Sequence, residues 1–490
     1  MSVFHSPILG LLIGIGAYLF PFSHTQAQPT TFSQDVWYHI FVRSFYDSND
    51  DRHGDLKGIT QKLDYLQELG ITGIMLSPIQ DADCYHNYFA NDFYRIDPRL
   101  GTMDDFLELR KETRKRNLRL ILDMEMQYVT DKHPWFKDSY QNPASPYTPL
   151  LRYHDTGNTQ PEGGVWGLHS YKDWQGKDIG MISVDMTKPE TLQEMIRLFS
   201  YWSDPNQDGN PNDGVDGFRI DHMMDDLDNK GLIKNLYPVF WKPLIKKIKQ
   251  HYPKVFFIGE QANWGFDAPM FSVAGADAQF GFVQWYAFQT ARGHRIRGAV
   301  DSTRSATPGK HFYLTFVENH DTNRTSLPLQ TATALTLLTG GVPVLYYGQE
   351  IGMKGTKGDW GHDGNDIPMR QAFRWQKDRE AAGSAIWYKA DAPWWIPNFP
   401  PDDDLTSQQK NPDSTWRFYK KWIAFRKQNP LLFSGKLYWL PVSDDTLLAF
   451  ERREKGKRIR IWVNLSAQHR TVFQNQRHIS FAPFEIKIMH

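Results

Sequence analysis

Three short segments each carry an apolar, strand-like run that ends in a carboxylate. They are residues 217–221, 257–260 and 316–321, which end at Asp221, Glu260 and Asp321. Hydrolysis of a glycosidic bond needs a carboxylate on one side of the sugar and a proton donor on the other. A parallel barrel presents such groups together, because the C-terminal ends of its strands lie at one face. The spacing of the three segments suits different strands of one βα-repeating domain.

Strand-like runs followed by helix-like stretches make up most of the chain. The runs cover residues 36–45, 71–76, 118–124, 217–220, 255–259, 312–317 and 342–347, with a less regular run at 276–282. Apolar residues recur at helical spacing over 59–69, and a charged helix is predicted over 103–117. About eight such units predict an α/β fold, a closed (β/α)8 TIM barrel.

Two segments depart from this repeat. Residues 127–186 are rich in Pro, Gly, Tyr, Trp and His without sustained periodicity, and a long irregular stretch is usually functional. We expect an irregular insertion after the third strand, domain B, lying over the mouth of the barrel. Short strand-like runs after residue 433 predict a C-terminal all-β domain. The predicted division is a signal peptide (1–27), the barrel (28–126 and 187–432), the insertion (127–186) and the C-terminal domain (433–490).

Composition limits the partners of the protein. The 490 residues are 40% hydrophobic, which suffices for one large barrel core. Lys+Arg and Asp+Glu both number 56, so nothing favours nucleic acid or an anionic membrane as partner. Most of the aromatic residues are expected in the core, and some are expected to stack on sugar rings.

The N-terminus carries an apolar run from Ile8 to Phe20, followed by small residues at Thr25 and Ala27. Thirteen apolar residues are too few to span a membrane, and the small residues suit a cleavage site. The usual basic residue before the run is missing. We expect a cleaved signal, a secreted or periplasmic protein that starts near Gln28, and no stable membrane anchor. The single cysteine, Cys84, cannot form an internal disulfide.

Several motifs together resemble the α-amylase superfamily, glycoside hydrolase family 13. They are residues 47–59, 86–102, the three carboxylate segments and residues 346–353, in the order and with the spacing of the family. The resemblance implies that Asp221 is the nucleophile, which forms a covalent glycosyl-enzyme. It implies that Glu260 is the general acid and later the general base, and that Asp321 hydrogen-bonds hydroxyls of the reacting sugar.

Further binding residues follow from the same motifs. Arg219 precedes Asp221 by two residues on one strand, so it faces the same side and can keep Asp221 ionised by its charge. The pKa of Glu260 should be raised by neighbouring carboxylates and burial. The resemblance implies that Tyr88 and His320 stack on and hydrogen-bond the sugar at the cleavage site.

Two loops rich in Asp and Asn suggest structural Ca²⁺, which prefers six to eight oxygen ligands. The first loop, which also resembles a metal loop of the family, offers oxygens of Asp47, Asn49, Asp51, His53 (its carbonyl) and Asp55. The second offers Asp204, Asn206, Asp208 and Asp213. The alternative for either loop is a turn without an ion, because Asp and Asn favour turns.

One segment departs from the family where substrate is bound. The family usually has Asp-Val-Val-x-Asn-His where this chain has residues 123–128, Asp-Met-Glu-Met-Gln-Tyr. Gln127 thus replaces an asparagine that is often a calcium ligand, and Tyr128 replaces a histidine that usually touches the sugar. We expect Tyr128 to donate a hydrogen bond from a differently shaped group. The Lys-His pair that often follows the nucleophile in starch-cleaving α-amylases is also absent, since Asp221 is followed by His222, Met223, Met224 and Asp225.

These features predict an exported retaining α-glycosidase acting on α-glucans or on malto- or isomalto-oligosaccharides, with endo and exo cleavage both open. One alternative is an α-glucosyltransferase that uses the same covalent intermediate. A second is a non-catalytic carbohydrate-binding protein of the same fold, which the retention of all three carboxylates disfavours.

Overall fold

The computed structural model describes residues 32–388, 393–394, 403–474 and 477–489. The predicted signal peptide, residues 1–27, lies outside the described residues. Within the described ranges, no helix combines the length and the apolar character needed to cross a membrane.

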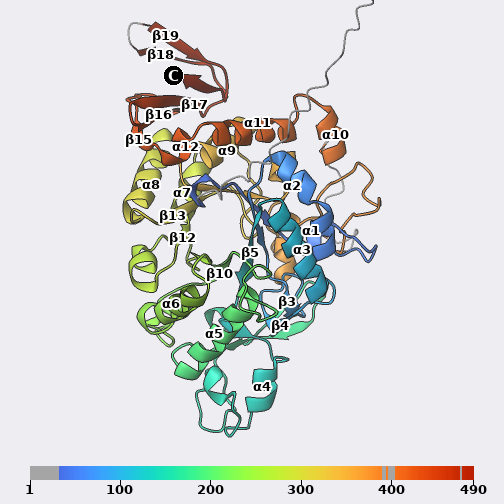
Figure 1. Ribbon diagram of the computed structural model, residues 1–490. Helices are drawn as coiled ribbons and strands as arrows, with labels where there is room; N and C mark the ends of the chain where they lie inside the picture. The colour runs from blue at the N-terminus through green and yellow to red at the C-terminus, as the bar shows by residue number, and fades with distance from the viewer. Residues whose placement is uncertain (1–31, 389–392, 395–402, 475–476, 490) are drawn as a thin grey trace, which may run out of the picture.

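Eight parallel strands close into a barrel (Figure 1). In order around the barrel they are β1 (Trp37–Ile40), β2 (Gly73–Leu76), β5 (Arg119–Met124), β10 (Gly217–Ile220), β11 (Phe256–Gly259), β12 (Ala278–Phe280), β13 (Phe312–Thr315) and β14 (Val342–Tyr346). Parallel strands that are covered on both faces read as continuous apolar runs, as in the fully buried β14. The predicted barrel is confirmed, and the less regular run near residue 280 supplies β12.

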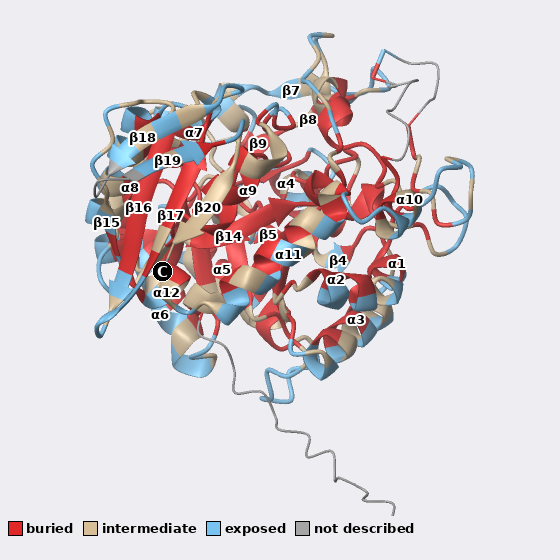
Figure 2. Ribbon diagram, turned by 90° about the horizontal axis from the view of Figure 1, so that it is seen from above, coloured by how far each residue is buried: buried red, intermediate tan, exposed pale blue. Residues whose placement is uncertain are grey.

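Helices surround the barrel, and most of them expose one face to solvent (Figure 2). They are α1 (Leu56–Gln61), α2 (Leu63–Leu69), α3 (Met103–Lys115), α5 (Pro189–Ser203), α6 (Lys242–His251), α7 (Phe282–Gln289), α8 (Gly293–Ala306), α9 (Leu329–Leu337) and α11 (Thr415–Gln428). In α3 a capping box of Thr102 and Asp105 fixes the start, and Phe106 and Leu109 are buried. The amphipathic run predicted over 59–69 forms two helices that break at Lys62.

The segment after β5 builds a small sheet beside the barrel. Its strand order is β3-β4-β6-β9, with β3 (Gln80–Ala82), β4 (Ala90–Ile96), β6 (Tyr128–Val129) and β9 (Ile182–Ser183). Helix α4 (Pro134–Ser139) and the hairpin of β7 (Ser170–Lys172) and β8 (Asp178–Gly180) complete it. Because β3 and β4 come from the connection after β2, two barrel loops form this sheet. Figure 1 shows α4 at the opposite end of the molecule from the C-terminal strands.

The chain ends in antiparallel sheets, which confirms the predicted C-terminal all-β domain. A four-stranded sheet has the order β15 (Lys436–Trp439), β16 (Leu447–Glu454), β17 (Lys457–Asn464) and β20 (Ile486–Met489). The sequence analysis missed the hairpin of β18 (Arg470–Gln474) and β19 (Arg477–Phe481). Its residue Phe473 is 67% exposed, so the apolar alternation that marks a half-buried strand is weak here. Helix α12 (Leu431–Ser434) leads from α11 into this region, and α10 (Leu405–Lys410) precedes α11 and packs against it.

Candidate active site

The three predicted carboxylates lie together at the C-terminal ends of the barrel strands. Asp221 directly follows β10, Glu260 directly follows β11, and Asp321 lies in the loop after β13. All three line one cavity of about 360 Å³. Other side chains in its wall are His86, Tyr88, Phe89, Glu125, Trp166, His222, Trp264, His320, Lys357, Asp363, Asp366 and Arg370.

The strand register places the first two carboxylates side by side. Strands β10 and β11 pair in parallel with Ile220 opposite Gly259, so the residue after each strand reaches the same level. The amide of Glu260 donates to the Ile220 carbonyl at 3.2 Å, which extends the ladder to Glu260. A Cβ at Gly259 would lie 2.2 Å from the Met270 sulfur. A side chain at this position would therefore require the Met270 side chain to shift.

Arg219 joins the carboxylates from below. Its side chain is 1% exposed, and its Nη1 lies 3.0 Å from Asp221 Oδ1 and 2.8 Å from Asp123 Oδ1. Its Nη2 also donates to Glu260 Oε2. Burial alone would raise the pKa of Asp221, but Arg219, His222 and hydrogen bonds with Glu260 and Glu125 lower that pKa below its ordinary range. Arg219 thus faces the same side of the strand as Asp221, as their spacing of two residues predicted.

The surroundings of Glu260 shift its pKa in the opposite direction. Burial raises the pKa of Glu260 well above its ordinary value; Arg219 opposes this shift, whereas the charges of Asp221 and Asp321 add to it. Asp221 and Glu260 are close enough to hydrogen-bond each other. Inverting enzymes keep their two carboxyls ~6.5–9.5 Å apart to admit a water, and retaining enzymes keep them closer. An ionised carboxylate beside a protonated one therefore suits direct attack on a sugar carbon.

Tyr88 and His320 form one wall of the cavity. Their rings stack with centroids 5.3 Å apart and an interplanar angle of 6°. The Tyr88 hydroxyl lies 2.6 Å from His320 Nε2 and donates to Asp123 Oδ2 at 2.7 Å. His320 Nε2 also lies 3.0 Å from Asp321 Oδ2, and Arg370 Nη2 lies 3.1 Å from Asp321 Oδ1. Asp321 is thus fixed from two sides while its side chain remains 31% exposed to the cavity.

The family model "Alpha amylase, catalytic domain" matches residues 39–435. The chain belongs to the alpha-amylase family. Alpha-amylase 3 of Dictyoglomus thermophilum is 28% identical over 479 residues, which cover 90% of this chain and 87% of that protein. Trehalose synthase/amylase TreS of Mycolicibacterium smegmatis is 26% identical over 89% of this chain and 84% of its own. The crystal structure of an alpha-amylase from H. orenii shares the fold, with a TM-score of 0.74 at 24% identity, covering 93% of this chain and 98% of that one.

Tyr128, at the position of the family's sugar-contacting histidine, lies behind the cavity wall. Its side chain is fully buried, and its hydroxyl donates to Asp228 Oδ2 at 2.7 Å. His222 lies in front of it, 3.3 Å from the Tyr128 hydroxyl, and lines the cavity. His222 therefore separates the Tyr128 hydroxyl from the cavity. The direct hydrogen bond from Tyr128 to substrate that the sequence suggested does not follow from this placement.

His222 is a site residue that the sequence analysis did not select. Its Nδ1 lies 3.2 Å from Asp228 Oδ1 and its Nε2 lies 4.0 Å from Asp221 Oδ2. Burial alone would lower the pKa of His222, but the charges of Asp221 and Asp228 and the hydrogen bond to Asp228 raise it. The backbone φ of His222 is +45°, a left-handed conformation that is uncommon for a non-glycine residue and often marks a site. That turn places the imidazole beside Asp221.

Glu125 is the second side chain that the motifs did not single out. It is 4% exposed and lines the cavity within hydrogen-bond reach of Asp221. Two residues further on, Gln127 donates from Nε2 to the Asp221 carbonyl and accepts from the Met126 amide at 2.8 Å. Both polar atoms of the Gln127 side chain therefore hydrogen-bond within the protein. The sequence did contain a signal for Glu125, because a charged residue stands here where the family pattern has valine.

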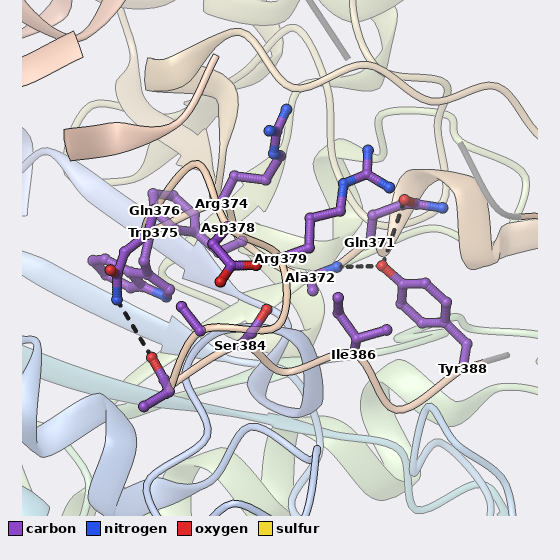
Figure 3. A pocket seen from close by; sticks show the side chains of 13 residues that line it. Gln371, Ala372, Arg374, Trp375, Gln376, Asp378, Arg379, Ser384, Ile386 and Tyr388 are labelled. Atoms are coloured by element: carbon purple, nitrogen blue, oxygen red, sulfur yellow. Dashed lines mark hydrogen bonds between the residues drawn. The ribbon is translucent and has the colours of Figure 1, made fainter. Parts of the chain in front are cut away.

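A second pocket is lined by residues between Gln371 and Tyr388 (Figure 3). None of these residues lines the cavity of Asp221, Glu260 and Asp321. The second pocket encloses about 20 Å³, which is room for about one water molecule. The Tyr388 hydroxyl accepts from the Ala372 amide at 3.0 Å. This pocket is therefore too small for a sugar ring.

The first predicted metal loop is organised by its own carboxylates. Asp47 accepts the amides of Asn49 and Arg52, Asp51 accepts the amide of His53, and Asp55 caps α1 through the Gly58 amide. This is the pattern of Asx turns. Among the described residues, no group of three His, Cys, Asp or Glu side chains is gathered as a metal site. Calcium at this loop stays a prediction.

The second predicted loop is less completely paired. Asp204 is 2% exposed and its Oδ2 accepts the Gly209 amide at 2.9 Å, but its buried Oδ1 has no hydrogen-bond partner. The Oδ1 of Asp213 is buried without a partner as well, and burial raises the pKa of this carboxyl. Asn206 and Asp208 contact each other, with Asn206 Nδ2 donating to Asp208 Oδ2 at 3.2 Å.

Proposed function

We propose that the protein is a retaining glycosidase that cleaves α-glucosidic bonds through a covalent glycosyl-enzyme. One observation carries the proposal. Asp221 and Glu260 lie within hydrogen-bond reach in one cavity, and their surroundings favour opposite protonation states, with the pKa of Asp221 lowered and that of Glu260 raised. Two carboxyls with such separated pKa values are the acid and the nucleophile that this chemistry requires.

The first half-reaction forms the intermediate. Asp221 attacks the anomeric carbon, the bond to the leaving oxygen breaks, and Glu260 gives its proton to that oxygen. In the second half-reaction Glu260 removes a proton from water, the water oxygen attacks the same carbon, and the electron pair of the ester bond returns to Asp221. Asp321, held by His320 and Arg370, accepts hydrogen bonds from sugar hydroxyls. These bonds strengthen as positive charge develops on the ring.

The proposed substrates are α-glucans or malto- or isomalto-oligosaccharides. The names of the relatives support a glucan, and the cavity supports a chain longer than one sugar. Trp166 is 66% exposed in the cavity wall. Trp264 also lines the cavity, and its ring stacks on Phe282 with centroids 5.1 Å apart. Exposed aromatic faces are suited to the apolar faces of sugar rings.

The alternative proposal is transfer of the glucosyl group to a sugar acceptor. It is supported by the relative named trehalose synthase/amylase and by the fact that both reactions use one intermediate. A non-catalytic binding role has less support, because the three carboxylates and their partners are all in place.

Product analysis separates these proposals. We expect incubation with maltoheptaose or with an isomalto-oligosaccharide to release shorter sugars whose first-formed anomer is α, as NMR would record. A spread of maltosaccharides would identify endo cleavage, and glucose alone would identify exo cleavage. Products longer than the substrate at high sugar concentration would favour the transferase. Initial release of the β anomer would contradict a retaining mechanism.

We also propose that the two Asp-rich loops hold structural Ca²⁺. The buried, unpartnered Oδ1 atoms of Asp204 and Asp213 fit a cation, because a buried carboxylate oxygen without a partner is costly. In the first loop the donor set fits by chemistry, since each carboxylate oxygen that accepts one amide retains a second lone pair. Calcium there would stabilise the loops, and no step of the reaction depends on it.

Chelation is therefore expected to lower the melting temperature. Ligand present at about 100 times its Kd contributes about 2.7 kcal/mol to the native state, and EDTA removes this contribution. The measurement is a melting curve with EDTA and with added Ca²⁺, for the wild type and for Asp204→Asn and Asp47→Asn separately. A variant that no longer responds to EDTA identifies the loop that binds. Superimposable wild-type curves would contradict bound calcium.

Export is the remaining part of the proposal. The apolar run before Pro21, which is too short for a membrane span, supports it. N-terminal sequencing of the mature protein is expected to begin near Gln28, and an intact Met1 in the exported fraction would contradict cleavage.

A further inference from the structure

Glu125 stands beside the nucleophile on the side away from the general acid. Strand β10, which carries Asp221, lies between β5 and β11 in the barrel. Glu260 follows β11, whereas Glu125 follows Met124, the last residue of β5. The amide of Asp221 donates to the Met124 carbonyl at 3.1 Å, so the residue after β5 is brought level with the nucleophile. The nucleophile is therefore flanked by a carboxyl group on each side.

The contacts of Glu125 define its protonation state. Its Oε1 accepts the Gln127 amide at 2.8 Å, and its carboxyl group lies within hydrogen-bond reach of Asp221 in the wall of the same cavity. In the described part of the chain, Arg219 pairs with Asp123, Asp221 and Glu260, and Glu125 has no ion pair of its own. Two carboxyl groups can hydrogen-bond only if one of them carries a proton. Since Arg219 holds Asp221 ionised, the proton lies on Glu125.

The charges around Glu125 act in the same direction. Burial and the negative charge of Asp221 raise the pKa of Glu125 well above its ordinary value, and the charge of Asp228 adds to this. The Gln127 amide opposes the shift. His222 faces the same carboxylates, Asp221 and Asp228, from the turn after β10.

We propose that Glu125 is a positioning residue that donates a hydrogen bond to Asp221 and stabilises it as the leaving group when the glycosyl-enzyme is hydrolysed. This inference rests on the function proposed above. A donor to a carboxylate lowers its basicity, which weakens it as a nucleophile and improves it as a leaving group. Glu125 therefore favours the second half-reaction over the first.

The proton balance of this step is simple. Water loses a proton to Glu260, its oxygen bonds to the anomeric carbon, and the bond from that carbon to Asp221 breaks. The electron pair returns to the Asp221 carboxylate, where negative charge accumulates. The Glu125 proton stays on Glu125 throughout, and its hydrogen bond shortens as that charge develops.

Two matched variants test the inference. Glu125→Gln keeps the shape, can accept the Gln127 amide with its carbonyl and can donate to Asp221 with its NH₂ group. Glu125→Met has a similar length and no donor. Aryl α-glucosides with graded leaving groups separate the two half-reactions: with an activated aryl group, kcat reports hydrolysis of the intermediate, while kcat/KM reports its formation. Melting curves check that both variants fold.

For Glu125→Met we expect kcat on the activated glucoside to fall about 10- to 100-fold, the range that one charge-assisted hydrogen bond commands. We expect kcat/KM to fall much less, and the covalent intermediate to accumulate, as intact-protein mass spectrometry would show. Glu125→Gln should restore kcat to within a few fold of the wild type.

Three outcomes would overturn the inference. Equal losses in kcat and kcat/KM for Glu125→Met, without accumulated intermediate, would indicate a merely structural role. A Glu125→Gln variant as impaired as Glu125→Met would show that Glu125 acts as an ionised base. A wild-type enzyme that shows neither turnover nor a covalent intermediate with any α-glucoside would overturn the proposed function, and this inference with it.

Discussion

Asp221→Gly is expected to reduce turnover by about 10⁴-fold or more, because the variant lacks the carboxylate that forms the covalent intermediate. The other two carboxyl groups of the proposed mechanism cannot take its place, since Asp321 is held by His320 and Arg370 and Glu260 must deliver the proton. Glycine also opens a space beside the anomeric carbon where Asp221 stood. The measurement is kcat on an α-glucan and on an activated aryl α-glucoside.

Chemical rescue gives this variant a positive readout. Added azide or formate can enter the space and attack the anomeric carbon from the side of the missing carboxylate. With azide we expect activity to return on the activated substrate and the product to be a β-glucosyl azide, since one inversion replaces two. Asp226→Asn serves as the control, because its carboxylate accepts the Gly231 amide outside the cavity. An Asp221→Gly enzyme as active as the wild type would refute the assignment.

The barrel could be predicted from the sequence because its strands are covered on both faces. Such strands read as continuous apolar runs, and each is followed by a helix in which apolar residues recur every three or four positions. The same principle explains the miss at β18 and β19. A two-stranded hairpin with Phe473 exposed buries too little on either face to leave a clear pattern.

The candidate site could be predicted only where a residue type is itself the signal. Asp221, Glu260 and Asp321 stand at strand ends in a recognisable order, and the structure brings them together. Glu125 and His222 depend on contacts between neighbouring strand ends that spacing along the chain does not reveal. The same holds for Tyr128. The sequence places it after β5 but does not reveal that the His222 imidazole lies between it and the cavity.

Glu260→Gln is the second variant with a large expected effect, and its size should depend on the leaving group. Loss of a general acid costs about 10²–10⁴-fold when the departing oxygen needs a proton. An oligosaccharide has such a leaving group, whereas an activated aryloxide departs without protonation. We therefore expect a large loss of kcat/KM on maltoheptaose and a small one on the activated aryl α-glucoside. Equal losses on both substrates would contradict the role of Glu260 as the acid.

The pH profile tests the same assignment from its charge states. Glu260 must be protonated and Asp221 ionised, so kcat/KM on maltoheptaose should fall as the pH rises through the raised pKa of Glu260, and on the acid side only as it drops through the lowered pKa of Asp221. His222 also has a raised pKa, so it is the competing source of an alkaline limb. Glu260→Gln should abolish that limb, while His222→Gln should keep it. An alkaline limb that disappears with His222→Gln and survives Glu260→Gln would assign the essential proton to the imidazole instead.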